Sequence, residues 1–115
     1  MLKTYEEVLK VTNELVNIES IVNTEGEINI SKSLAKTISN LPYFLKNPKY
    51  VFTSRTIDDE VERYNVFAFV KGIKGDSNKT VVLMGHTDTV GIDDYNSLKE
   101  KACLPNELHE ALKGE

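Results

Sequence analysis

The spacing of apolar residues predicts two helices in the first part of the chain. Apolar side chains recur at helical spacing over residues 5–19 and share one face of the expected helix. Thr4 and Glu7 have the spacing of a capping box, in which each side chain bonds to the backbone of the other. A second helical pattern covers residues 28–40, and Pro42 should end it because proline disfavours helical backbone in the preceding residue. We therefore expect two amphipathic helices joined by a polar loop.

The middle of the chain changes to a pattern that is typical of β-strands. Residues 50–56 and 65–70 are rich in β-branched and aromatic residues, and polar residues 58–60 between them predict a turn. We therefore expect an antiparallel hairpin. The following segment, Thr80–Met84, is apolar at four successive positions, which is typical of a strand buried on both faces of a sheet.

The last part of the chain is more polar. Apolar residues recur at helical spacing between Leu98 and Leu112, with Pro105 inside the pattern. Because proline interrupts a helix, we expect two short helical pieces or a kink.

Composition narrows the class of protein. The 115 residues suffice for one small α/β domain, and 40% hydrophobic with 28% charged residues is typical of a globular chain. A net charge of −4 without a basic stripe argues against nucleic-acid binding, and no apolar run approaches the ~20 residues of a membrane span. The single cysteine, Cys103, cannot form an internal disulfide, and no charged-then-apolar leader precedes the first helix. These features lead us to expect a cytoplasmic protein.

The strongest candidate for chemistry follows the apolar strand. His86 and Asp88 stand at its carboxyl end, which is where open α/β sheets bind ligands. Side chains two positions apart on an extended chain point the same way, so the carboxylate can orient the imidazole as a metal ligand requires. Gly85 leaves room for a close approach. The alternative is a core histidine that hydrogen-bonds to Asp88, and the tripeptide alone does not separate the two.

The other candidates are weaker. His109 lies between acidic residues at 107 and 110, which favours a solvated helix face over a second ligand position. The acidic residues 58–60 favour a turn over a hard-cation site. Cys103 has no positive or metal-binding context that would activate it and is expected to be a buried or partly buried small residue. Neither a phosphate-binding glycine loop nor a nucleophile elbow is present.

The stretch 81–90 resembles the first metal-ligand motif of the aminoacylase/carboxypeptidase-type di-zinc hydrolases, a superfamily that includes peptidase T and the desuccinylases. That motif is an apolar strand followed by Gly-His-x-Asp-x-Val, which Gly85, His86, Asp88 and Val90 match. Gly91 departs from the family, in which many members have proline at this place. The order of helices and hairpin upstream also resembles the family, and residues 91–95 look most like its arginine-utilisation branch.

The resemblance implies a fold and an activity. Residues 1–115 would be the incomplete N-terminal portion of a three-layer α/β/α catalytic domain of the zinc-exopeptidase kind. His86 would ligate one of two zinc ions, with cobalt or manganese as alternatives, and Asp88 would orient the histidine and stabilise charge during catalysis. A metal-bridging water would cleave an amide or peptide bond of a small peptide or N-acyl amino acid.

The rest of the family's site has no counterpart after His86: a bridging aspartate, a Glu-Glu pair, a further acidic ligand and a distal histidine. We therefore expect this chain to be inactive alone, and its uncovered apolar strand to invite self-association. Two alternatives stay open. One is a non-catalytic α/β binding or regulatory module, and the other is an oligomer that pools His86 and His109 from several chains.

Overall fold

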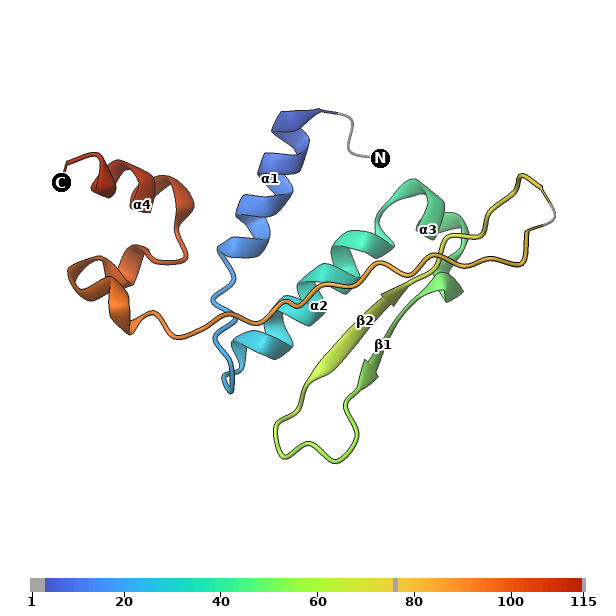
Figure 1. Cartoon of the computed structure of the whole chain (residues 1–115), viewed down its shortest axis with the longest axis horizontal. Coiled ribbons are helices and arrows are strands. Elements are labelled where there is room, and N and C mark those ends of the chain that lie inside the picture. The colour runs from blue at the N-terminus through green and yellow to red at the C-terminus, as the bar shows by residue number, and fades with distance from the viewer. Residues whose placement is uncertain (1–3, 76, 115) are drawn as a thin grey trace.

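The computed structural model describes residues 4–75 and 77–114, which form a mixed arrangement of helices and strands around one central helix (Figure 1). The first helix, α1 (Tyr5–Val16), begins with the predicted capping box. The Glu7 amide donates to Thr4 Oγ1 at 3.2 Å, and the Thr4 amide donates to Glu7 Oε2 at 3.0 Å. The helix stops at Val16, three residues before the predicted end, and the chain then turns through residues 17–25.

The central helix is α2 (Gly26–Ser39), close to the predicted range. It ends before Pro42, as expected, but the proline also begins a further short helix, α3 (Pro42–Lys46). Proline suits the first helical position because its missing N–H would have no partner there. A single 3₁₀ turn, η1 (Pro48–Tyr50), then leads into the sheet.

The predicted hairpin is confirmed. Strands β1 (Val51–Arg55) and β2 (Tyr64–Ala68) pair antiparallel, with Val51 opposite Ala68 and Arg55 opposite Tyr64. Helix α2 packs against both strands, and Ser31 Oγ donates to the Tyr64 carbonyl at 3.0 Å. The buried apolar side chains of the described residues are Ile30 on α2 and Phe44 on α3. The core is therefore small and centred on α2.

The C-terminal part has the two predicted helical pieces. The first is the 3₁₀ helix η2 (Asp93–Lys101), which is interrupted at Asn96 by a backbone φ of 48°. The second is α4 (Pro105–Leu112), with Pro105 in its first turn. The proline separates the two pieces instead of kinking one helix.

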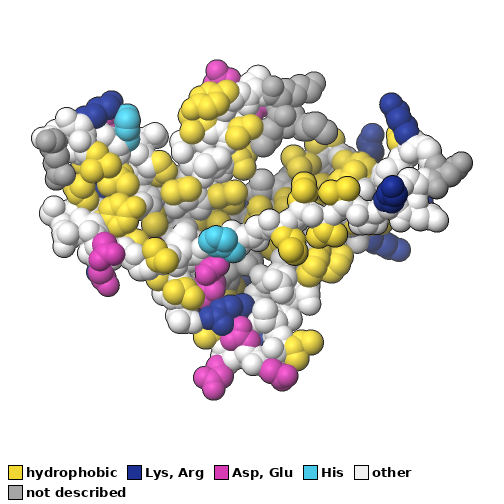
Figure 2. Space-filling model, in the orientation of Figure 1, with side chains coloured by type: hydrophobic (Ala, Val, Ile, Leu, Met, Phe, Trp, Pro, Cys, Tyr) yellow, Lys and Arg dark blue, Asp and Glu magenta, His cyan; other side chains and the backbone are white. Residues whose placement is uncertain are grey.

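The prediction of a buried central strand is wrong for the described residues. Residues 80–88 are extended but pair with no strand, and they run across α2 (Figure 1). Val81, Leu83 and Met84 are 84%, 91% and 92% exposed. In the described part of the chain, β1 and β2 pair only with each other, so no strand is available to cover this segment. Figure 2 shows hydrophobic side chains gathered along it at the surface.

The fold class is therefore mixed helix and strand, compatible with α/β, with one two-stranded antiparallel sheet among the residues described. None of the helices seen in residues 4–75 and 77–114 is long and apolar enough to cross a membrane.

Candidate functional site

His86 and Asp88 lie side by side on the extended segment. His86 Nδ1 is 3.0 Å from the backbone carbonyl oxygen of Asp88 and 3.3 Å from its Oδ1. The His86 side chain is 86% exposed, and Asp88 is 46% exposed. The structure thus brings the two candidate residues together at the surface, and the alternative of a histidine enclosed in a core does not describe this ring.

The nature of these two partners indicates which tautomer of the neutral ring fits this geometry. A carbonyl oxygen and a carboxylate oxygen both accept hydrogen bonds, so Nδ1 must carry the proton that it donates. In the neutral ring the lone pair then lies on Nε2, which has no hydrogen-bond partner within residues 4–75 and 77–114. An imidazole whose Nδ1–H is held by an oxygen acceptor is a typical metal ligand through Nε2.

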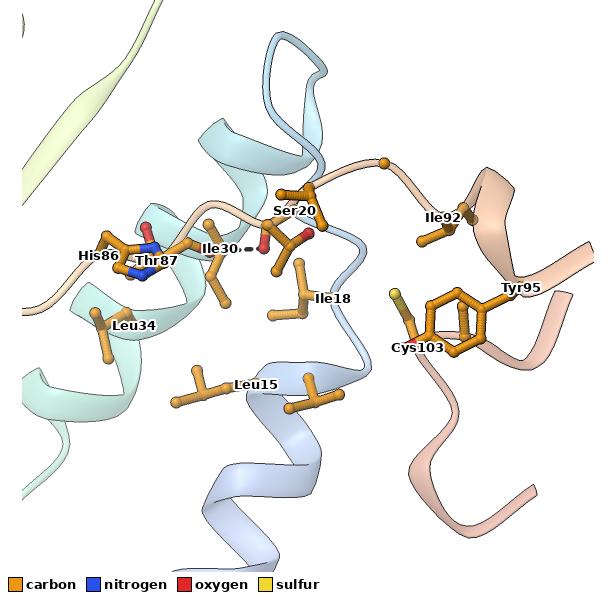
Figure 3. Close-up of a pocket in the computed structure, with 15 residues that line it drawn as sticks. Leu15, Ile18, Ser20, Ile30, Leu34, His86, Thr87, Ile92, Tyr95 and Cys103 are labelled. Carbon is orange, nitrogen blue, oxygen red and sulfur yellow. Dashed lines mark hydrogen bonds between the residues drawn. The ribbon is translucent and has the colours of Figure 1, made fainter. Parts of the chain in front are cut away.

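The loop after α1 holds this segment in place. The Thr89 amide donates to the Ser20 carbonyl at 2.9 Å, and the Val22 amide donates to the Thr89 carbonyl at 3.0 Å, which forms a parallel bridge between Ile21 and Thr89. Ser20 Oγ donates to the Thr87 carbonyl at 2.7 Å (Figure 3). We call residues 20–22 the strap. Its contacts span 67 positions of sequence, so no local pattern predicted them.

Arg63 fixes the other end of that loop. Its Nε donates to Glu27 Oε1 at 3.0 Å, its Nη1 donates to Asp59 Oδ1 at 2.7 Å, and its Nη2 donates to Asn23 Oδ1. The Asn23 amide in turn donates to Glu27 Oε2 at 2.6 Å. The hydrogen bond from Arg63 holds the pKa of Asp59 below its ordinary value, with further lowering by the Val61 amide.

The Arg63 contacts also bear on whether the acidic turn at residues 58–60 is a cation site. Both carboxylate oxygens of Asp59 accept from the guanidinium, so this carboxylate is already paired with a cationic side chain. The i, i+4 spacing of Asp59 and Arg63 was the available sequence signal for the pair, but nothing local indicated Glu27.

Two hollows lie on either side of residues 86–88. The first, about 400 Å³, is mostly apolar and lies between α1, α2 and the start of η2, as Figure 3 shows. The second, about 600 Å³, lies between α2, β2 and the extended segment, and Glu27, Arg63 and Asp88 line it. His86 and Thr87 line both hollows. The candidate ligand therefore lies on the wall between a mostly apolar hollow and a second hollow whose lining also includes charged residues.

The remaining candidates lie elsewhere. His109 is exposed on α4, in agreement with a solvated helix face. Cys103 is half-buried beside the apolar hollow, and this burial, helped by the charge of Glu19, raises the pKa of its thiol. Across the residues that the structure describes, no three His, Cys, Asp or Glu side chains are grouped to hold a metal ion.

Comparison with known proteins gives two relatives. No protein-family model matches the sequence, and no solved structure matches it. Protein RocB of Bacillus subtilis (strain 168) is 39% identical over 97 residues, which are 84% of this chain and 17% of RocB. The uncharacterized protein YqjN of the same organism is 39% identical over 106 residues, which are 92% of this chain and 18% of YqjN. The chain thus spans about a sixth of the length of these relatives, and over most of its own length it is similar to RocB and YqjN.

Proposed function

We propose that this chain is part of a metal-dependent hydrolase of the aminoacylase/carboxypeptidase type, in which His86 is one metal ligand and Asp88 orients it. The observation that carries the proposal is the pair of contacts from His86 Nδ1 to Asp88, which leave Nε2 without a hydrogen-bond partner among the described residues. The substrate class that goes with this proposal is a small peptide or an N-acyl amino acid.

The residues of the chain fit one ligand position and do not complete a site. A catalytic zinc ion normally has three protein ligands and a water, and no three His, Cys, Asp or Glu side chains of the described residues are grouped to hold one. The other ligands and the general base belong, in this proposal, to a larger catalytic domain of which residues 1–115 are the N-terminal portion in a three-layer α/β/α arrangement. The chain alone is then expected to be inactive, because a missing base cannot be replaced by binding energy.

The similarity to RocB supports the same branch of the superfamily that the motif resembles. RocB is 39% identical to this chain over 84% of the chain's length, and residues 91–95 resemble the arginine-utilisation branch of the superfamily. We therefore include a role in arginine utilisation in the proposal. The metal is proposed to be zinc, with cobalt or manganese as alternatives, since one histidine does not discriminate between them.

Zinc titration of the chain followed by ¹⁵N NMR of its two histidines tests the proposed ligand. We expect the His86 Nε2 resonance to shift at lower zinc concentrations than any His109 resonance, with weak affinity because one protein ligand is present. His109→Ala is the matched control and should leave the His86 response unchanged. Equal responses of the two histidines, or a loss of binding in His109→Ala, would contradict the assignment of His86 and would favour a pooled or non-catalytic role.

Sequencing the gene and transcript beyond codon 115 tests the hydrolase itself. The proposal expects an open frame that encodes an aspartate-bearing motif and a Glu-Glu pair. A stop codon directly after Glu115, with no such segment, would overturn the assignment to a hydrolase.

A further inference from the structure

Ser20 is a buried polar residue that makes one specific contact to the candidate site. It is 3% exposed, and its Oγ donates to the carbonyl oxygen of Thr87 at 2.7 Å. Thr87 is the residue between His86 and Asp88. The Ser20 hydroxyl therefore binds the Thr87–Asp88 peptide group, which lies between the two candidate residues His86 and Asp88 (Figure 3).

The strap adds two further bonds next to this contact. The Ser20 carbonyl accepts from the Thr89 amide at 2.9 Å, and the Thr89 carbonyl accepts from the Val22 amide at 3.0 Å. Three hydrogen bonds thus fix residues 87 and 89, on both sides of Asp88. These bonds limit rotation of the Asp88 backbone, and that backbone presents the carbonyl and the carboxylate to His86 Nδ1.

We propose that Ser20 is a positioning residue, which sets the geometry of Asp88 and through it the tautomer and tilt of His86. The inference rests on the proposed function for its meaning, since a correctly aimed Nε2 matters for a metal ligand. The inference predicts that Ser20, which has no hydrogen bond to the His86 ring, determines which nitrogen of that ring carries the proton. Removal of one member of a buried hydrogen bond leaves the Thr87 carbonyl without that donor and frees the segment to move.

The test compares Ser20→Ala with the unchanged chain by two NMR measurements that need no metal. The first is the ¹⁵N tautomer of His86 at about pH 9, where imidazole rings are neutral. We expect the Nδ1–H form in the unchanged chain and a mixture richer in Nε2–H in Ser20→Ala. The second is hydrogen exchange at the Thr89 amide, which we expect to be faster by roughly 2- to 12-fold, the factor that one net hydrogen bond provides.

Ser31→Ala is the matched control. Ser31 is also 3% exposed, and its Oγ lies within hydrogen-bond distance of the Glu27 and Tyr64 carbonyls, away from residues 86–89. Ser31→Ala should destabilise the chain about as much as Ser20→Ala does. It should leave the His86 tautomer and the hydrogen exchange at the Thr89 amide unchanged. Ser20→Cys keeps a weaker donor of similar size, should give intermediate values, and decides the question where Ser20→Ala fails to fold.

Two results would overturn the inference. One is an unchanged His86 tautomer and Thr89 exchange rate in Ser20→Ala, or in Ser20→Cys if the alanine variant does not fold. The other is an equal effect of Ser31→Ala. A failure of zinc to bind at His86 is a different result, because it removes the proposed function and leaves the effect of Ser20 on ring geometry measurable.

Discussion

At the scale of single residues, the two acceptors beside His86 Nδ1 determine what the ring can do. An exposed histidine without such partners samples both tautomers. Neither of its nitrogens is then held ready as the ligand of a metal site. The Asp88 carbonyl and carboxylate favour the Nδ1–H tautomer without enclosing the ring. In that tautomer the lone pair lies on Nε2, which has no hydrogen-bond partner among the described residues.

Gly26 is a second residue whose identity the fold requires. A Cβ at this position would lie 1.8 Å from the Glu19 carbonyl oxygen and 3.0 Å from the Ser20 Cα, so the backbone at residues 19 and 20, where the strap begins, lies directly on the start of α2. We expect Gly26→Ala to lower the free energy of unfolding by about 1–3 kcal/mol, because backbone must move to admit the methyl group. Urea denaturation followed by circular dichroism measures this.

Gly72→Ala is the control for that prediction. A Cβ at Gly72 meets no atom of the described residues within 4 Å, and its backbone φ is not among the positive values. The substitution should be neutral or slightly stabilising, since alanine restricts the unfolded chain. Equal destabilisation by both substitutions would contradict the packing of the strap on α2.

At the scale of secondary-structure elements, Arg63 joins the loop after α1, the start of α2 and the β1–β2 turn. Its guanidinium bonds to Asn23, Glu27 and Asp59, one from each of these places. Glu27 is 8% exposed, and its carboxylate accepts hydrogen bonds from Arg63 Nε. These contacts hold the loop after α1 at Asn23, directly after the strap.

The Asp59–Arg63 pair makes part of the stability depend on pH. The pKa of Asp59 is lowered in the folded chain from a reference of 3.8, chiefly by the hydrogen bond from Arg63. A lowered folded pKa contributes stability above the unfolded value, and this contribution is lost as the pH falls through the folded pKa. We expect Asp59→Asn to be less stable than the unchanged chain at neutral pH, with a difference that shrinks below about pH 4.

Denaturation at a series of pH values checks this, with Glu60→Gln as the control. Glu60 is an exposed neighbour with no hydrogen bond to the described residues. A difference between Asp59→Asn and the unchanged chain that stays constant down to low pH would show that Arg63 does not stabilise the Asp59 carboxylate.

The elements that the sequence predicted well are those whose signals are local. The capping box of α1, the hairpin and the break at Pro105 each depend on residues within a few positions of one another. The burial of residues 80–84 was mispredicted because it depends on neighbouring strands that the described residues do not supply. For the site, the His86–Asp88 pair followed from spacing, whereas Ser20 acts across 67 positions and had no local signal.

At the scale of the whole molecule, the chain is open. Its radius of gyration is 17.2 Å, against about 13 Å for a compact domain of similar size. Its accessible surface is 9613 Å², against about 6,300 Å² expected for a folded monomer of this mass. Many large apolar side chains are exposed, and the segment 81–84 contributes four of them in succession (Figure 2).

We therefore expect the isolated chain to self-associate through this segment. Exposed backbone in an extended, apolar stretch pairs readily with another chain. Leu83→Glu should reduce concentration-dependent association in sedimentation velocity. Ile73→Glu is the control. Ile73 is as exposed as Leu83 (93% and 91%), but it lies outside the apolar run. Equal effects of the two substitutions, or a monomer at all concentrations, would contradict this expectation.

The most direct test of the central claim is the tautomer of His86 in the unchanged chain, read from long-range ¹H–¹⁵N correlations at about pH 9. The account predicts that Nδ1 carries the proton and that Nε2 is the bare nitrogen. A ring found mainly in the Nε2–H form would show that Asp88 does not hold it, and the proposed metal ligand would lose its basis.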